Sequence, residues 1–189
     1  MARQKEFNPD NIINKALALF RQRGYEATSV NDLVQHLGIG RGSLYNTFGN
    51  KHDLYLAALD RYLEESEDAP MLTPPLNAKE TITALLFQQV EQALQDAPLG
   101  GCFLVNSAVE LGAHDPDVAT RVKNNLANGE EGFYQLLSHD PSLALSDNER
   151  RQLAQFFLNI VLGIRLMAKT NPDRTMLTNV VTVALRVLG

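Results

Sequence analysis

Residues 28–51 read TSVNDLVQHLGIGRGSLYNTFGNK, and this stretch predicts two short helices joined by a tight turn. Ser29 followed by Asp32 is typical of a capping box at the start of a helix. Gly38 is expected to end that helix, because helices commonly end on a left-handed residue and glycine adopts this conformation without steric cost. Between them, apolar side chains at helical spacing mark one buried face: Val30, Leu33, Val34 and Leu37.

The second helix of the stretch is predicted over about residues 40–48. Leu44 and Phe48 share one face of it, so the opposite face is centred on Gly42 and Asn46. Gly42 would let the backbone approach DNA closely, although glycine costs a helix about 1 kcal/mol relative to alanine. The alternative is that Gly42 packs against a neighbouring helix. A helix-turn-helix of this kind lays its second helix in the major groove of DNA.

Polar and basic side chains around the second helix are candidate DNA contacts. Asn46 can pair with a base edge, Tyr45 and Ser43 can reach phosphates, and Arg41 can bind guanine or a phosphate. Lys51 falls in the first turn of the next predicted helix, which Asn50 is expected to cap. A cation is unfavourable there, so a DNA phosphate is its natural partner, and the alternative is a solvated lysine.

A further helix is predicted before the motif, from Pro9 to about Gly24. Residues 9–60, and within them ALALFRQRGYEATSVNDLVQHLGIGRGSLYNTFGNKHDLYLAAL, resemble the DNA-binding domain of the TetR family of bacterial transcriptional regulators. The resemblance departs at Gly40, where many members have a polar helix cap. It implies DNA contacts at Thr28, Arg41, Gly42, Ser43, Tyr45, Asn46, Thr47 and Lys51, and Ser29 completes the predicted set.

Composition is consistent with a cytoplasmic protein of one large or two small domains. The chain has 189 residues, 44% of them hydrophobic, a net charge of −5 and a single cysteine, which suits a reducing compartment. We expect neither a signal peptide nor a membrane span. Residues 1–60 hold seven Lys or Arg against six Asp or Glu, whereas the remainder holds ten against sixteen. The mildly positive part is therefore the one that carries the helix-turn-helix.

The rest of the chain reads as helices only. One is predicted over 50–67, followed by a proline-rich linker, DAPMLTPPLNAK, and then by helices over about 78–95, after Gly100–Gly101, after Asp115, after Ser146 or Asp147, and after Asp173. We therefore predict an all-α fold with a three-helix N-terminal helix-turn-helix domain (1–50) and a C-terminal helical bundle (51–189) for ligand binding and dimerisation. Helix 51–67 would link the two.

The last two predicted helices carry more apolar surface than one face needs. A helix that is apolar most of the way round is buried on several sides, so we expect a twofold four-helix interface with a second copy. The family resemblance implies the same, and the alternative is that both helices lie in the core. The predicted interface residues are Phe156, Ile160, Ile164, Val180, Val181 and Ala184.

The predicted bundle also contains polar groups in an apolar helix, CFLVNSAVELGA. Asn106 and Glu110 would line a ligand cavity, as the resemblance implies for this bundle, together with Phe87, Phe103, Phe133 and Phe157. The alternative is that Asn106 caps a neighbouring loop and Glu110 is solvated. Cys102 is either a reactive thiol at a helix start or a small buried apolar group, and we favour the second.

No enzyme signature stands out. The four histidines (36, 52, 114 and 139) lack metal-ligand spacing, and no phosphate-binding loop or catalytic motif is present, so we expect no metal, no cofactor and no enzymatic activity. The sequence predicts a homodimeric repressor that binds a pseudo-palindromic double-stranded DNA operator and is released by a small-molecule effector. The alternatives are a DNA-binding protein without an effector, or an all-α enzyme with a vestigial helix-turn-helix.

Overall fold

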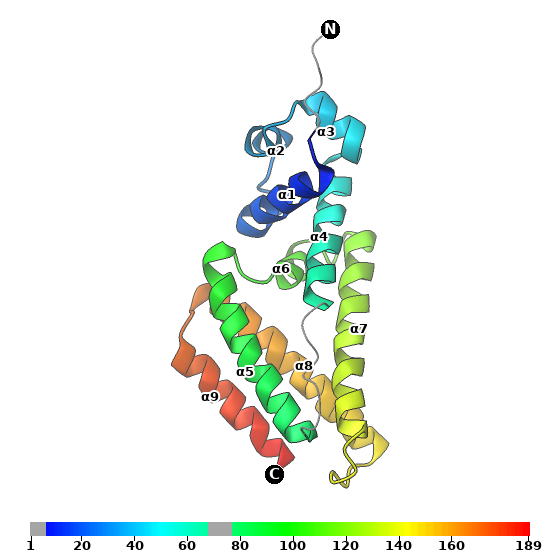
Figure 1. Cartoon of the computed structure of the whole chain (residues 1–189), viewed down its shortest axis with the longest axis vertical. Coiled ribbons are helices and arrows are strands. Elements are labelled where there is room, and N and C mark those ends of the chain that lie inside the picture. The colour runs from blue at the N-terminus through cyan, green and yellow to red at the C-terminus, as the bar shows by residue number, and fades with distance from the viewer. Residues whose placement is uncertain (1–6, 68–76) are drawn as a thin grey trace.

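The computed structural model describes residues 7–67 and 77–189 (Figure 1). These residues form helices and no strands, which confirms the predicted all-α class. The elements, in chain order, are α1 (Pro9–Arg23), α2 (Val30–Leu37), α3 (Arg41–Phe48), α4 (Lys51–Glu67), α5 (Ala78–Asp96), the 3-10 turn η1 (Ala97–Leu99), α6 (Phe103–Glu110), α7 (Pro116–Ser138), α8 (Asp147–Thr170), α9 (Arg174–Ala184) and η2 (Leu185–Leu188). The predicted linker lies largely outside the described residues.

The helix-turn-helix forms as its local signals predict. Ser29 and Asp32 make a capping box at the start of α2, and Gly38 ends that helix at φ 69°, in the left-handed region. The side-chain oxygen of Asn50 accepts hydrogen bonds from the amides of His52 and Asp53, at 2.8 and 3.0 Å, and so caps α4. These signals are short-range, which is why the sequence alone reveals them.

Helix α4 runs from the helix-turn-helix into the C-terminal helices and packs on both (Figure 1). Its buried residues Leu54, Tyr55 and Leu59 belong to a core shared with α1, α2, α3, α6 and α7. A second core lies between α5, α8 and α9, around Leu86 and Phe157. Hydrophobic packing is therefore continuous from α1–α4 to α6 and α7.

Among the described helices, α8 alone has the length and hydropathy to cross a membrane. One side of it is buried in the second core through Phe157, Val161, Ile164 and Ala168. A core helix of a water-soluble protein passes the same test of length and composition. Phe156 and Ile160, on another side of α8, lie beside α9.

Candidate nucleic-acid interface and ligand cavity

Helix α3 presents the surface that its sequence pattern predicts. Leu44 is fully buried and Phe48 packs against the same core. On the opposite side Gly42 and Asn46 are exposed, and Tyr45 is 42% exposed. A Cβ atom built on Gly42 meets no described atom within 4 Å, so Gly42 does not pack against a neighbouring helix. The glycine opens the helix backbone toward whatever α3 binds.

Two predicted DNA contacts, Thr28 and Ser29, form hydrogen bonds within the chain. The Thr28 side chain is completely buried, and its hydroxyl donates to the carbonyl oxygen of Gly24 at 2.6 Å. The prediction that this hydroxyl contacts DNA does not agree with its position, because it fixes the turn between α1 and α2. Ser29 is exposed, but its hydroxyl bonds the Asp32 carboxylate, which lowers the pKa of Asp32.

Lys51 is held in place by an aromatic ring. Its ammonium nitrogen lies 3.9 Å from the centre of the Tyr25 ring, a cation–π contact. The Lys51 side chain is half-buried, so it is not the freely solvated lysine of the alternative interpretation. This contact positions a cation beside α3, at the start of the next helix.

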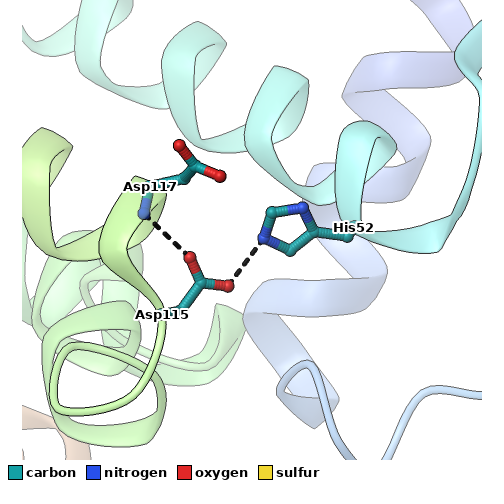
Figure 2. A group of neighbouring side chains, drawn as sticks. All are labelled: His52, Asp115 and Asp117. Carbon is teal, nitrogen blue, oxygen red and sulfur yellow. Dashed lines mark hydrogen bonds and ion pairs between the residues drawn. The ribbon is translucent and has the colours of Figure 1, made fainter.

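A histidine–carboxylate pair joins the start of α4 to the start of α7 (Figure 2). The ring nitrogen Nε2 of His52 lies 2.6 Å from Oδ2 of Asp115, while Oδ1 of Asp115 accepts from the amides of Asp117 and Val118. Burial raises the pKa of Asp115, but the hydrogen bonds from the Val118 amide and from His52 outweigh it and lower the pKa. Both Asp115 oxygens thus have partners, and the pair acts as a clamp between the two helices.

That cluster also brings a third potential metal ligand close. Ligand atoms of His52, Asp115 and Asp117 lie within 4.8 Å of one another. The grouping is not apparent from the sequence, because His52 is far from the two aspartates along the chain. The Asp-Pro helix cap at Asp115 was the one local signal that pointed to part of it.

A cavity of about 390 Å³ lies between α5, α7 and α8 and is closed at one side by the end of α4. Of the six predicted ligand contacts, Phe133 is in its wall. Its lining residues are Tyr62, Leu63, Thr81, Leu85, Gln89, Leu104, Asn125, Leu126, Asn128, Gly129, Gly132, Phe133, Leu136, Leu158, Val161, Leu162 and Arg165. The volume is within the range of small-molecule sites.

Three aromatic residues predicted for the cavity lie elsewhere. Phe103 and Phe157 are 1% and 0% exposed and fill the first and second cores, respectively. Phe87 is 37% exposed and lies outside the cavity wall. Helical spacing identifies such residues as apolar, but the packing of several helices decides which of them face a void.

Asn106 and Glu110 connect α6 to α1 instead of lining the cavity. The Asn106 amide donates to the carbonyl oxygen of Gly100 at 2.9 Å, so the loop-capping alternative describes it correctly. Glu110 accepts from the backbone amides of Tyr25 and Glu26 at 3.0 and 2.8 Å. Glu110 therefore lies outside the wall of this cavity and holds the chain between α1 and α2.

Arg21 ties α1 to the region between α5 and α6. Its guanidinium lies 2.5 Å from the Asp96 carboxylate, with both side chains only 13% exposed, and its Nε donates to the Gly101 carbonyl oxygen at 2.5 Å. The guanidinium carbon also lies 5.6 Å from the centre of the Tyr62 ring, in the cavity wall. Nothing in the sequence indicates this contact, because its partners lie far apart along the chain.

Cys102 is 3% exposed and immediately precedes α6. The Tyr62 hydroxyl donates to its sulfur at 3.3 Å, and burial raises the pKa of that hydroxyl. A nitrogen of Arg165 lies 3.7 Å from the same sulfur. The buried position supports the interpretation of Cys102 as a small packing residue.

We expect the Cys102 thiol of the folded protein to react with iodoacetamide much more slowly than in the urea-unfolded chain, because the reagent cannot reach a buried sulfur. Cys102→Ser should keep operator binding, with a modest loss of stability. The measurements are alkylation rates at several pH values and operator affinity of the variant. Rapid alkylation of the folded chain, together with oxidant-induced DNA release that the serine variant lacks, would instead identify a sensor.

Helices α8 and α9 expose an apolar face to solvent. It is lined by Phe156, Ile160, Met176, Val180, Val183, Ala184 and Val187. Ile164 and Val181, both predicted for the subunit interface, are 1% and 0% exposed and fill the chain's own second core, so that part of the prediction was wrong. The two helices thus have distinct inner and outer apolar faces.

The geometry defines a helix-turn-helix DNA-binding protein with a helical C-terminal region. Residues 12–58 match the family model described as "Bacterial regulatory proteins, tetR family". The chain is 37% identical over 194 residues to the uncharacterized HTH-type transcriptional regulator YezE of Bacillus subtilis (strain 168), covering all of both chains. It is 30% identical over 190 residues to the HTH-type transcriptional repressor ComR of Escherichia coli (strain K12), covering 97% of this chain and 90% of ComR.

Solved structures give the same result. A cysteine mutant of the TetR family regulator CifR complexed with 26bp operator DNA superposes with a TM-score of 0.84 at 26% identity, over 98% of each chain. A TetR regulator from Chloroflexus aurantiacus J-10-FL has a TM-score of 0.83 at 24% identity, over 95% of this chain and 92% of that one. The chain therefore belongs to the TetR family of bacterial transcriptional regulators and is a DNA-binding regulator.

Proposed function

We propose that the protein is a cytoplasmic, homodimeric repressor that leaves a pseudo-palindromic operator when a small molecule enters its cavity. The observation that carries this proposal is the cavity wall itself. Tyr62 and Leu63, at one end of α4, line the cavity, whereas Lys51 begins the same helix beside α3. One rigid element therefore reaches both the ligand site and the DNA-binding surface.

On the DNA side, the proposed base and phosphate contacts come from α3 and its neighbours. They are Ser29, Arg41, Gly42, Ser43, Tyr45, Asn46, Thr47 and Lys51, with Thr28 supporting the turn from beneath. Residues 1–50 then form the DNA-binding domain and residues 51–189 the ligand-binding and dimerisation domain. The operator complex of the related CifR supports the DNA partner.

Several contacts can carry a change in the cavity to α3. The carboxylate of Asp60 on α4 binds Arg121 on α7 at 2.6 and 3.0 Å, next to the His52–Asp115 clamp. The Tyr55 hydroxyl on α4 lies 2.7 Å from the hydroxyl of Ser107 on α6, and burial raises the pKa of Tyr55 to about 12, so the phenol stays protonated. A ligand that displaces α7 or α4 would thereby alter the position of α1–α3.

The proposed dimer uses the outer apolar face of α8 and α9. Two α3 helices must address half-sites about 34 Å apart, one turn of DNA, and a twofold axis through these helices fixes that separation. Ligand binding favours a dimer geometry with a different separation, which is a population shift between two states. The similarity to ComR, a transcriptional repressor, supports repression as the outcome.

The other two functions are less well supported. A DNA-binding protein without an effector needs no cavity, whereas this bundle contains one of about 390 Å³. An enzyme needs convergent titratable groups, yet Arg165 is the one charged side chain among the described residues that line the cavity. A ligand-binding regulator fits both observations.

The direct test is a selection of bound sequences from random duplex DNA by the full-length protein. We expect an enriched sequence with twofold symmetry, from which a subset of a small-molecule library releases the protein in an anisotropy assay. An enriched sequence that no library member affects, in a protein whose cavity also binds none of them, argues for the effector-independent alternative.

Tyr45→Ala and Lys51→Ala should each weaken binding to the selected operator without unfolding the dimer. Lys51→Ala should also reduce the slope of log affinity against log salt concentration by about one, as the loss of one phosphate contact does. Lys79→Ala is the matched control, because Lys79 is an exposed lysine at the far end of α5 (Figure 1). Unchanged affinity in both test variants would show that α3 is not the DNA-contacting helix.

A further inference from the structure

The cavity between α5, α7 and α8 has a mostly apolar wall with one charged side chain, Arg165, among its described residues. Apolar side chains form most of its wall: Leu126, Phe133, Leu136, Leu158, Val161 and Leu162. Arg165 lies on α8 two turns beyond Leu158, which places their backbones about 10 Å apart along the helix. Tyr62 and Gln89 line the cavity near the arginine.

The Arg165 guanidinium has no negative partner among the described residues. It donates from Nε and Nη2 to the side-chain oxygen of Gln89, at 3.0 and 2.6 Å, and Nη1 contacts the Cys102 sulfur. The Gln89 amide carries no charge, and no carboxylate among the described residues forms an ion pair with Arg165. The nearby carboxylate of Asp96 is already bound by Arg21 at 2.5 Å.

The Arg165 guanidinium is half-buried against an apolar wall and lacks a carboxylate partner among the described residues. Removing a cation from water is costly unless it is paired, and a planar guanidinium binds carboxylate-type anions through parallel hydrogen bonds. We propose that the cavity binds an amphipathic monoanion, such as a medium-chain or aryl-substituted carboxylate. The acid group binds Arg165, and the apolar body lies against Phe133, Leu136 and Leu158. This inference rests on the proposed ligand-responsive function and specifies the ligand class.

The single cation in the described cavity wall limits the ligand to one acid group. Arg165 is the one charged residue in the described cavity wall. A second acid on the same ligand would lie away from Arg165, where the described wall offers no other cation, which is unfavourable. A dicarboxylate of equal length should therefore bind less well than the monocarboxylate.

The position of Arg165 also connects ligand charge to the DNA-binding helices. The Cys102 sulfur that Arg165 contacts also accepts the hydroxyl of Tyr62, which comes from α4. The Tyr62 ring in turn lies beneath the Arg21 guanidinium of α1. An acid that draws Arg165 into the cavity would therefore alter the contact between Arg165 and Cys102. Cys102 in turn contacts Tyr62, the α4 side chain that also contacts Arg21 of α1.

The test compares paired probes on the full-length protein by isothermal titration calorimetry at neutral pH. The pairs are decanoate with decan-1-ol and 4-phenylbutyrate with 4-phenylbutan-1-ol, with decanedioate as the dianion. For at least one pair we expect the carboxylate to bind about 10- to 100-fold more tightly than the alcohol, the range of a hydrogen bond to a charged group. Arg165→Gln should abolish the preference, and Arg165→Lys should keep part of it.

Arg151→Gln is the matched control. Arg151 lies on the same helix, outside the cavity wall, and pairs with Glu131 at 2.7 Å, so its substitution should leave the preference unchanged. Equal binding of acid and alcohol in both pairs, no binding by any probe, or a preference that survives in folded Arg165→Gln would overturn the inference. If carboxylates bind through Arg165 but never release operator DNA, the ligand class stands and the proposed repressor mechanism fails.

Discussion

Val183→Asp is expected to convert the protein into a folded monomer with greatly reduced operator affinity. Val183 is 57% exposed and lies in the outer apolar face of α8 and α9. In the proposed dimer the new carboxylate would be buried without a partner, whereas in the monomer it is solvated. Loss of the second DNA-binding domain should lower operator affinity by about two to four orders of magnitude, as loss of bivalency does.

The neighbouring positions provide two controls on the same helix. Val181→Asp should unfold the protein, because Val181 is 0% exposed and the charge would enter the chain's own core. Thr182→Asp should remain a dimer, because Thr182 is exposed and outside the apolar face. Sedimentation velocity, circular dichroism and operator anisotropy distinguish the three results. A Val183→Asp dimer with wild-type operator affinity would place the interface elsewhere.

Gly42→Leu is expected to stabilise the protein and to weaken operator binding by about 100-fold, equivalent to about 2.7 kcal/mol. Leucine is a good helix former, and its introduction in place of glycine should stabilise α3 by up to about 1 kcal/mol. A Cβ built at Gly42 meets no described atom within 4 Å beyond its own helix backbone, so a side chain can start there without a clash. In the major groove, the same side chain would hold the helix backbone away from DNA.

Opposite signs for stability and binding make this result specific. A variant that unfolds loses DNA binding whichever residues contact DNA. A variant with a raised unfolding temperature and lost operator affinity is folded, so its DNA-contacting surface must be blocked. Gln88→Leu on α5 is the control, because Gln88 is exposed on a helix and lies outside the cavity wall. It should retain operator binding. Full operator binding by Gly42→Leu would mean that this face of α3 does not enter the groove.

The helix boundaries could be predicted because their signals act over three or four residues. The Ser29–Asp32 capping box and the left-handed Gly38 each report on a single helix end. Asp115, Ser146 and Asp173 likewise cap α7, α8 and α9, as expected from their side chains. Such contacts need no knowledge of tertiary structure.

The C-terminal site could not be predicted in the same way. Periodicity identifies Phe103 and Phe157 as apolar, but whether a side chain faces a core or a void depends on three or more helices. The contact between Glu110 and the amides of Tyr25 and Glu26 joins residues that are 85 and 84 positions apart along the chain. One local signal was available: Gly129 and Gly132 lie one turn apart on α7, and both line the cavity.

Three of the four glycines within the described helices, Gly42, Gly132 and Gly163, would place an added Cβ atom more than 4 Å from every described neighbour. They lie, respectively, on the helix proposed to bind DNA, in the cavity wall, and on α8 one turn beyond Ile160. Each lowers helix stability by about 1 kcal/mol relative to alanine, and close packing within the described chain does not require glycine at any of the three positions. A screen of random variants for heat resistance alone would therefore enrich substitutions at these positions first. The resulting proteins should be more stable but altered at the surface proposed to bind DNA, in the proposed ligand cavity, or beside the proposed subunit interface.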